Sequence, residues 1–220
     1  MSRFTSPTSF ERPTETTVAR AERIAGVAFV VLAAEFLVGI MLAAAMAPAY
    51  ELNPSAISDL GVMSETALLF NASLGLVGAL NIVGGLYLYR VHGKRWLLGV
   101  FVLAGIGAIG TGVFPLDSPT GLHGLFALVA FLAFNLEAIG VATVVRGPMR
   151  VLSVLAGVVG LVFLVVMAFG DAGNTALFGP IGHGGTERMI VYPPMVWLLV
   201  FGGYLLARSE GDAEPASRLA

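Results

Sequence analysis

Long apolar runs separated by short polar segments dominate the pattern of the chain. Each run is close to the length that an α-helix needs to cross about 30 Å of hydrocarbon. The pattern therefore predicts an all-α membrane protein, a bundle of six transmembrane helices. The predicted spans cover about residues 24–46, 66–89, 96–114, 122–145, 151–169 and 189–207.

The two ends of the chain lack apolar runs. Residues 1–23 are rich in Ser, Thr, Pro, Glu and Arg, which predicts a disordered cytoplasmic tail, and residues 208–220 form a second predicted tail. The first apolar run is about 23 residues long and lacks the small-residue cleavage context of a signal peptide. We therefore interpret it as the first span.

Composition supports the membrane interpretation and narrows the chemistry. Only 12% of the 220 residues are charged, about half the share found in soluble domains. The chain has no cysteine, which excludes disulfides and thiolate metal sites. A net charge of −2 gives no reason to expect a nucleic-acid partner. Membrane lipids are the expected partners, and the oligomeric state is open.

The basic residues are sorted to one side of the predicted bundle. All but Arg188 fall in the tails or in the short connections after the second and fourth spans. By the positive-inside rule, both termini are predicted to be cytoplasmic, in a multi-pass protein of the cell membrane. The residues on that side are Arg3, Arg12, Arg20, Arg23, Arg90, Lys94, Arg95, Arg146, Arg150, Arg208 and Arg218.

The three longer connections lie on the opposite, outer side and hold the candidate chemistry. Histidine and carboxylate ligands with an open position suit a catalytic divalent metal such as zinc. We assign Asp117, His123 and His183 as its candidate ligands, although no standard zinc motif is present and the sequence requires no cofactor. The sequence leaves open whether these side chains come together in the folded protein. The candidate catalytic residues are Asp59, Asp117, His123, His183 and Glu187.

Helix signals place some of these residues. Asn53 before Pro54 predicts the N-cap of a short helix on which Ser55 and Asp59 share a face. Ser118 before Pro119 predicts the start of the fourth span, one turn before His123. A histidine there is expected to be neutral. It could bind a metal, accept a proton, or only bond a loop carbonyl.

The last outer connection leads into the sixth span. Thr186 is the predicted N-cap of that span. Gly184 and Gly185 argue against a continuous helix that would place His183 and Glu187 on one face. Arg188 is unfavourable near a helix N-terminus, so we expect it to pair with an acid or to bind an anionic headgroup, with Ser55 as a second substrate-binding residue.

Polar residues also occur inside the predicted spans. Glu35 lies in the middle of the first span, and Asn135 and Glu137 lie in the middle of the fourth. A charge at that depth costs several kcal/mol. The two acids are either protonated and hold helices together, or they form a proton or cation path. Pro193 and Pro194 are expected to free backbone carbonyls near the outer end of the sixth span.

Three motifs carry a resemblance to a known family. They are Ser55-Ala56-Ile57-Ser58-Asp59-Leu60-Gly61, Val113-Phe114-Pro115-Leu116-Asp117 with His123, and Gly184-Gly185-Thr186-Glu187-Arg188-Met189 with Tyr192-Pro193. In this order, they resemble the uncharacterised prokaryotic membrane family called domain of unknown function 998. The resemblance covers most of the chain. It implies a six-span membrane protein common in archaea and bacteria, without an established activity.

Three functions fit these observations. The first is an outer-face polar site that binds a lipid or lipid-linked group, or hydrolyses it with the help of a metal. The second is a proton- or cation-coupled transporter of small solutes that uses Glu35 and Glu137. The third is a non-catalytic membrane accessory protein, which needs nothing beyond the bundle. The sequence does not decide whether the protein is an enzyme.

Overall fold

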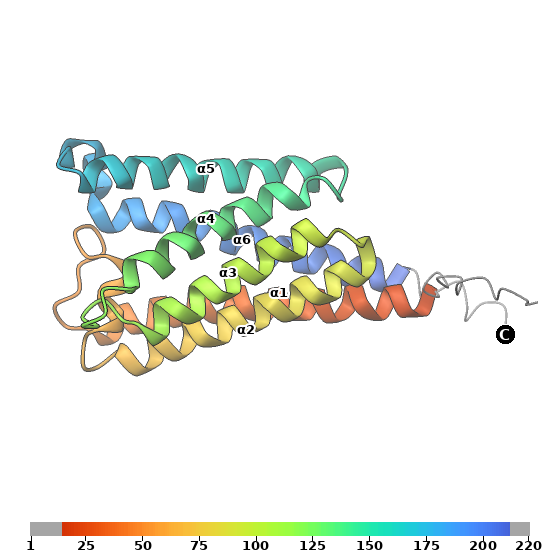
Figure 1. Cartoon of the computed structure of the whole chain (residues 1–220), viewed down its shortest axis with the longest axis horizontal. Coiled ribbons are helices and arrows are strands. Elements are labelled where there is room, and N and C mark those ends of the chain that lie inside the picture. The colour runs from red at the N-terminus through yellow and green to blue at the C-terminus, as the bar shows by residue number, and fades with distance from the viewer. Residues whose placement is uncertain (1–14, 212–220) are drawn as a thin grey trace, which may run out of the picture.

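Six long helices and two short 3₁₀ helices make up the computed structural model of the protein, which describes residues 15–211 (Figure 1). No strand occurs within this range. In chain order, the elements are α1 (Glu15–Met46), η1 (Ile57–Gly61), α2 (Ala67–His92), α3 (Arg95–Val113), α4 (His123–Val141), α5 (Gly147–Asp171), η2 (Thr175–Ile181) and α6 (Gly182–Gly211).

The predicted all-α bundle is confirmed, because all six long helices are long and apolar enough to cross a membrane. Their ends differ from the predicted ones. α1 begins at Glu15, so residues 15–23 are helical rather than disordered. Good helix formers such as Ala19, Arg20 and Ala21 favour this extension, and Ala21 is buried. Residues 1–14 and 212–220, with Arg3, Arg12 and Arg218, lie outside the described residues.

The six helices form a closed ring. Each helix packs on its neighbours in sequence, and α6 packs back on α1. In Figure 1, the long connecting segments lie at the left end of the bundle, which we call the loop end. The short turns after α2 and α4 lie at the other end, here called the basic end because the described basic residues other than Arg188 gather there. Assignment of the basic end to the cytoplasm stays a prediction.

Aromatic rings and glycines hold the ring of helices together. Phe29, Phe101 and Phe201 are fully buried, and the Phe29 ring centroid lies 5.4 Å from that of Phe101 and 5.6 Å from that of Phe201. A Cβ added at Gly78 would lie 2.3 Å from the carbonyl oxygen of Gly105 on α3. Glycine therefore lets α2 and α3 approach backbone to backbone, as small residues do in membrane bundles.

α6 runs without interruption through Pro193 and Pro194. Since Pro194 has no N–H, the carbonyl of Ile190 loses its usual helical donor. The buried amide of Asn135 on α4 replaces it, with its Nδ2 donating to the Ile190 oxygen at 3.1 Å. Gly160 of α5 leaves room for this amide, because a Cβ there would lie 1.8 Å from the Asn135 Oδ1. The intramembrane Asn135 thus joins three helices.

Candidate functional site

The first loop-end segment, between α1 and α2, does not form the predicted two-turn helix. Its helix is η1, which begins only at Ile57. Asn53 does not cap it, because its side-chain amide instead donates to the carbonyl of Pro180 at 2.7 Å. The cap comes from within the segment, since Asp59 Oδ2 accepts the N–H of Ala56 at 2.9 Å. Asp59 therefore has one carboxylate oxygen committed to local structure.

The second loop-end segment, between α3 and α4, extends further along the chain than predicted. α4 begins at His123 and not at Pro119, because Gly121 adopts a φ of +66° that no helix contains. His123 is thus the first helical residue, and only 7% of it is exposed. Its Nδ1 lies 2.9 Å from the carbonyl oxygen of Phe114. Since a carbonyl only accepts, Nδ1 carries the proton and fixes the tautomer of the ring.

The third loop-end segment, between α5 and α6, differs most from the prediction. α6 begins at Gly182, so His183 and Glu187 lie one turn apart on one continuous helix. Thr186 is not its N-cap, because its hydroxyl donates back to the carbonyl of Gly182 at 2.9 Å. The glycines serve close packing rather than helix breaking. A Cβ at Gly184 would lie 2.0 Å from the Ser55 carbonyl oxygen, so only glycine lets the first segment lie on the helix here.

Arg188 ties the first segment to α6. It is buried, and its Nη1 donates to the carbonyls of Leu52, Ser55 and Gly184 at 2.8, 3.2 and 2.8 Å. Its Nη2 donates to the Tyr50 hydroxyl. Tyr50 in turn donates to the carbonyl of Ala56 at 2.9 Å. Burial raises the pKa of Tyr50, against the opposing effect of Arg188, so the phenol stays protonated.

Glu187 makes a second tie between the same elements. Its carboxylate accepts the backbone N–H of Ile57 at 2.5 Å, and only 5% of the residue is exposed. The hydrogen bond joins the first turn of η1 to α6 across 130 residues of sequence. Together with Arg188, Glu187 fixes the first segment as a cover over the loop end of the bundle.

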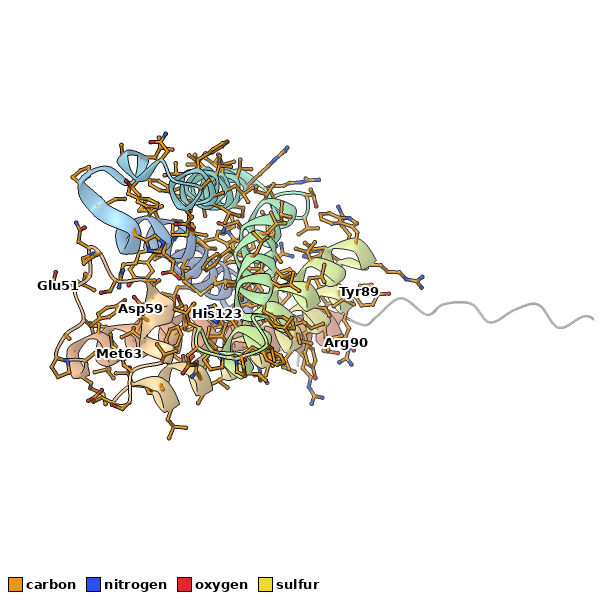
Figure 2. The ribbon with its side chains drawn as sticks, turned by 60° about the vertical axis from the view of Figure 1, so that its left-hand side comes forward. Glu51, Asp59, Met63, Tyr89, Arg90 and His123 are labelled. Carbon is orange, nitrogen blue, oxygen red and sulfur yellow. The ribbon has the colours of Figure 1, made fainter. Side chains whose placement is uncertain are left out.

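Beneath this cover lies a cavity of about 430 Å³, which we call the loop-end pocket. Its polar lining comes from all three segments, and Figure 2 shows two of these residues, Asp59 and His123, at the same end of the bundle. Its polar or charged lining residues are Ser58, Asp59, His123, Asp171, His183 and Glu187. Its volume lies within the range of about 300–1,000 Å³ typical of small-molecule sites.

The wall of the loop-end pocket between α4 and α5 is apolar. Along α4, the lining runs from His123 to Phe131, and along α5 from Asp171 back to Leu164. At 1.5 Å per residue, these stretches descend about 10–12 Å below the polar rim. Leu128 is 52% exposed and Ala168 is also exposed, so the pocket reaches the side of the bundle that faces lipid.

Two groups on the polar rim are arranged for hydrogen bonding to a ligand. His183 Nε2 lies 3.2 Å from Asp171 Oδ1, and its ring packs edge-on against Phe178 at 5.2 Å between centroids. The other is His123, whose Nδ1 is bonded to Phe114 and whose Nε2 makes no hydrogen bond within the described residues. In the neutral ring, this nitrogen is an acceptor that lacks a donor.

A smaller inner cavity of about 60 Å³ lies behind the loop-end pocket, deeper in the bundle. Five residues line both spaces, namely Ser58, His123, Ala127, Phe131 and Glu187. The remaining lining of the inner cavity is almost entirely apolar, with Thr111 as the exception. His123 and Glu187 therefore lie at the boundary between the polar rim of the loop-end pocket and the mostly apolar inner cavity.

The structure brings some predicted site residues together and separates others. Asp59, His123, His183 and Glu187 share the loop-end pocket. Asp117 is exposed in the turn after α3 and is not part of its lining. Of the two residues predicted to bind substrate, Ser55 lies in the cover, and Arg188 lies on α6 and bonds to the cover. Within residues 15–211, no three His, Asp or Glu side chains are grouped to hold a metal, so the expected zinc site is not supported.

Sequence reasoning missed two lining residues, Ser58 and Asp171. Ser58 lies in the first of the three family motifs, but no chemical signal there marked it as a site residue. Asp171 did carry a signal, because an acid at the C-terminal end of an apolar helix is unfavourable against the helix dipole. Such an acid calls for a partner, and the structure supplies His183.

The intramembrane acids lie apart from both cavities. Glu137 is fully buried, and its Oε2 accepts the Asn81 Nδ2 at 2.9 Å. The same nitrogen donates to the carbonyl of Phe101 at 3.0 Å, so this group joins α2, α3 and α4. Glu35 on α1 is partly buried beside Ser73 of α2. Neither acid lines the loop-end pocket or the inner cavity.

Comparison with known proteins identifies one match. Residues 30–204 match the family described as "Protein of unknown function (DUF998)". No curated protein and no solved structure matches the chain. The matched range includes all three loop-end segments and most of every long helix.

Proposed function

The chain belongs to the family of unknown function DUF998, and we propose that it binds a membrane amphiphile, a lipid or a lipid-linked molecule, in the loop-end pocket. One observation carries the proposal. A single cavity combines a polar rim at the end of the bundle with an apolar wall that descends between α4 and α5. An amphiphile has the same two parts in the same order.

The position of the pocket favours a ligand that enters from the bilayer. The exposed side chains of Leu128 and Ala168 belong to its lining, so an acyl or prenyl chain can lie against them without leaving the apolar phase. The headgroup would then reach Asp59, His123 and Glu187 under the cover. Catalytic roles for Asp59, Asp117, His123, His183 and Glu187 stay predictions, and binding needs no metal.

The proposal is tested by cross-linking with a lipid that carries a diazirine in its chain. In the purified protein, we expect the label on the α4 and α5 residues that line the pocket. Ala168→Trp, which places an indole in the pocket wall, should remove most of this label. Ala72→Trp on α2 is the matched control, because Ala72 is also exposed near the loop end but does not line the pocket.

The cross-linking pattern also separates the proposal from nonspecific solvation by lipid. Label spread evenly over the exposed faces of all six helices, and reduced equally by both tryptophans, would contradict a binding pocket. In that case the accessory-protein interpretation, which requires only the bundle, would be preferred.

A further inference from the structure

The loop-end pocket offers acceptors and few donors. Asp59 Oδ2 and Asp171 Oδ1 have partners within the protein, but the second oxygen of each carboxylate makes no hydrogen bond within the described residues. His123 Nε2 is a third acceptor without a donor. Among the described residues, the lining contains no lysine or arginine.

His123 is the acceptor at the boundary of the two cavities. The residue is only 7% exposed, and it lines both the loop-end pocket and the inner cavity. A ligand in the loop-end pocket can therefore donate a hydrogen bond to His123 Nε2.

The charges around the pocket also disfavour an anionic headgroup. If His183 is protonated, its charge is balanced by Asp171 at 3.2 Å. Arg188 is directed away from the lining, with its Nη atoms on carbonyls and on a phenol in the cover. Asp59 and Glu187 also line the pocket, and both are acids, so the lining carries no excess positive charge. An anionic headgroup would meet carboxylates there, and like charges in contact are strongly disfavoured.

We infer that the headgroup bound in the loop-end pocket is a hydrogen-bond donor without negative charge, carrying ammonium or hydroxyl groups rather than a phosphate or carboxylate. This inference rests on the proposed function and corrects the anionic headgroup expected from Arg188. The ammonium or hydroxyl hydrogens bond to His123 Nε2 and to the open oxygen of Asp59.

Competition against the diazirine lipid tests the inference. The competitors are a long-chain amine, the glycerol ether of the same chain and the fatty acid of the same chain. We expect the amine and the glycerol ether to displace the probe at concentrations at least about ten-fold lower than the acid. Asp59→Asn should reduce the advantage of the amine over the glycerol ether, because it removes charge but keeps an acceptor. Glu51→Gln, exposed and outside the lining, is the matched control.

The outcomes distinguish the inference from the proposal on which it rests. A fatty acid that competes as well as the amine and the glycerol ether overturns the inference but leaves the pocket in place. Equal effects of Asp59→Asn and Glu51→Gln on the amine overturn the assigned role of Asp59. If no competitor displaces the probe and Ala168→Trp leaves the label unchanged, the proposed function fails first.

Discussion

The contact between Asn135 and the proline-containing stretch of α6 allows a quantitative prediction. Asn135 is fully buried and supplies the donor that Pro194 cannot give to the Ile190 carbonyl. Asn135→Ala removes that donor and leaves a carbonyl unsatisfied inside the bundle. An orphaned buried carbonyl costs about 1–3 kcal/mol, whereas interhelical hydrogen bonds in membranes average about 0.6 kcal/mol. We therefore expect a loss of about 1–3 kcal/mol in the free energy of unfolding.

A double-mutant cycle isolates this hydrogen bond from the void that alanine leaves. Pro194→Ala restores an N–H four residues after Ile190, so the helix can satisfy its own carbonyl. In that background, the void left by Asn135→Ala is the same, but the carbonyl keeps a partner. The cost of Asn135→Ala should fall by at least about 0.6 kcal/mol.

Unfolding in SDS, followed by the fluorescence of the buried Trp197, measures the four free energies of the cycle. Asn174→Ala is the matched control, because Asn174 is exposed in the segment before η2 and should change little. Equal costs of Asn135→Ala with proline and with alanine at position 194 would refute the reasoning, since the amide would then contribute nothing through the carbonyl.

Three further predictions concern Gly78, Arg188 and Glu187. Gly78→Ala should lower the thermal unfolding temperature, because its Cβ would lie 2.3 Å from the Gly105 carbonyl oxygen. Gly75→Ala on the same helix is the control, because its Cβ meets nothing within 4 Å, and it should stabilise the protein by up to about 1 kcal/mol. Arg188→Lys should speed hydrogen exchange in the first loop-end segment about ten-fold or more, since an ammonium cannot reproduce the bonds of the planar guanidinium to several acceptors. Unchanged exchange would show that the cover does not depend on the guanidinium. Glu187→Leu should expose the first amide of η1 to exchange, while Glu187→Gln, which keeps an acceptor, should protect it better.

The number and order of the helices could be predicted because a bilayer leaves few alternatives. Every backbone polar group in hydrocarbon needs a partner within the chain, so each long apolar run must be a helix. The ends of the helices were harder to predict. α1 extends nine residues before the predicted start, where side-chain polarity no longer distinguishes a helix in water from a tail.

The loop end could be predicted only in part, because local signals there compete with tertiary contacts. Asn53, Ser118 and Thr186 all have the side chains of helix caps, but none caps a long helix. Gly184 and Gly185 look like helix breakers, yet they are helical because the first segment packs against this stretch. The predicted site residues therefore include four that line the loop-end pocket, Asp59, His123, His183 and Glu187, while the geometry depends on contacts between residues more than a hundred positions apart.

The hydrogen bond between Ile57 and Glu187 links the completion of the loop-end pocket to the order in which the chain is made. Its acceptor lies on α6 and its donor precedes α2, so this hydrogen bond cannot form until α6 has joined the first five helices. Until α6 arrives, the ring of helices is also open between α5 and α1. Without α6, the ring would thus keep an open seam and the first segment would lack its bonds to Glu187 and Arg188, so the loop-end pocket is complete only after α6 has been made.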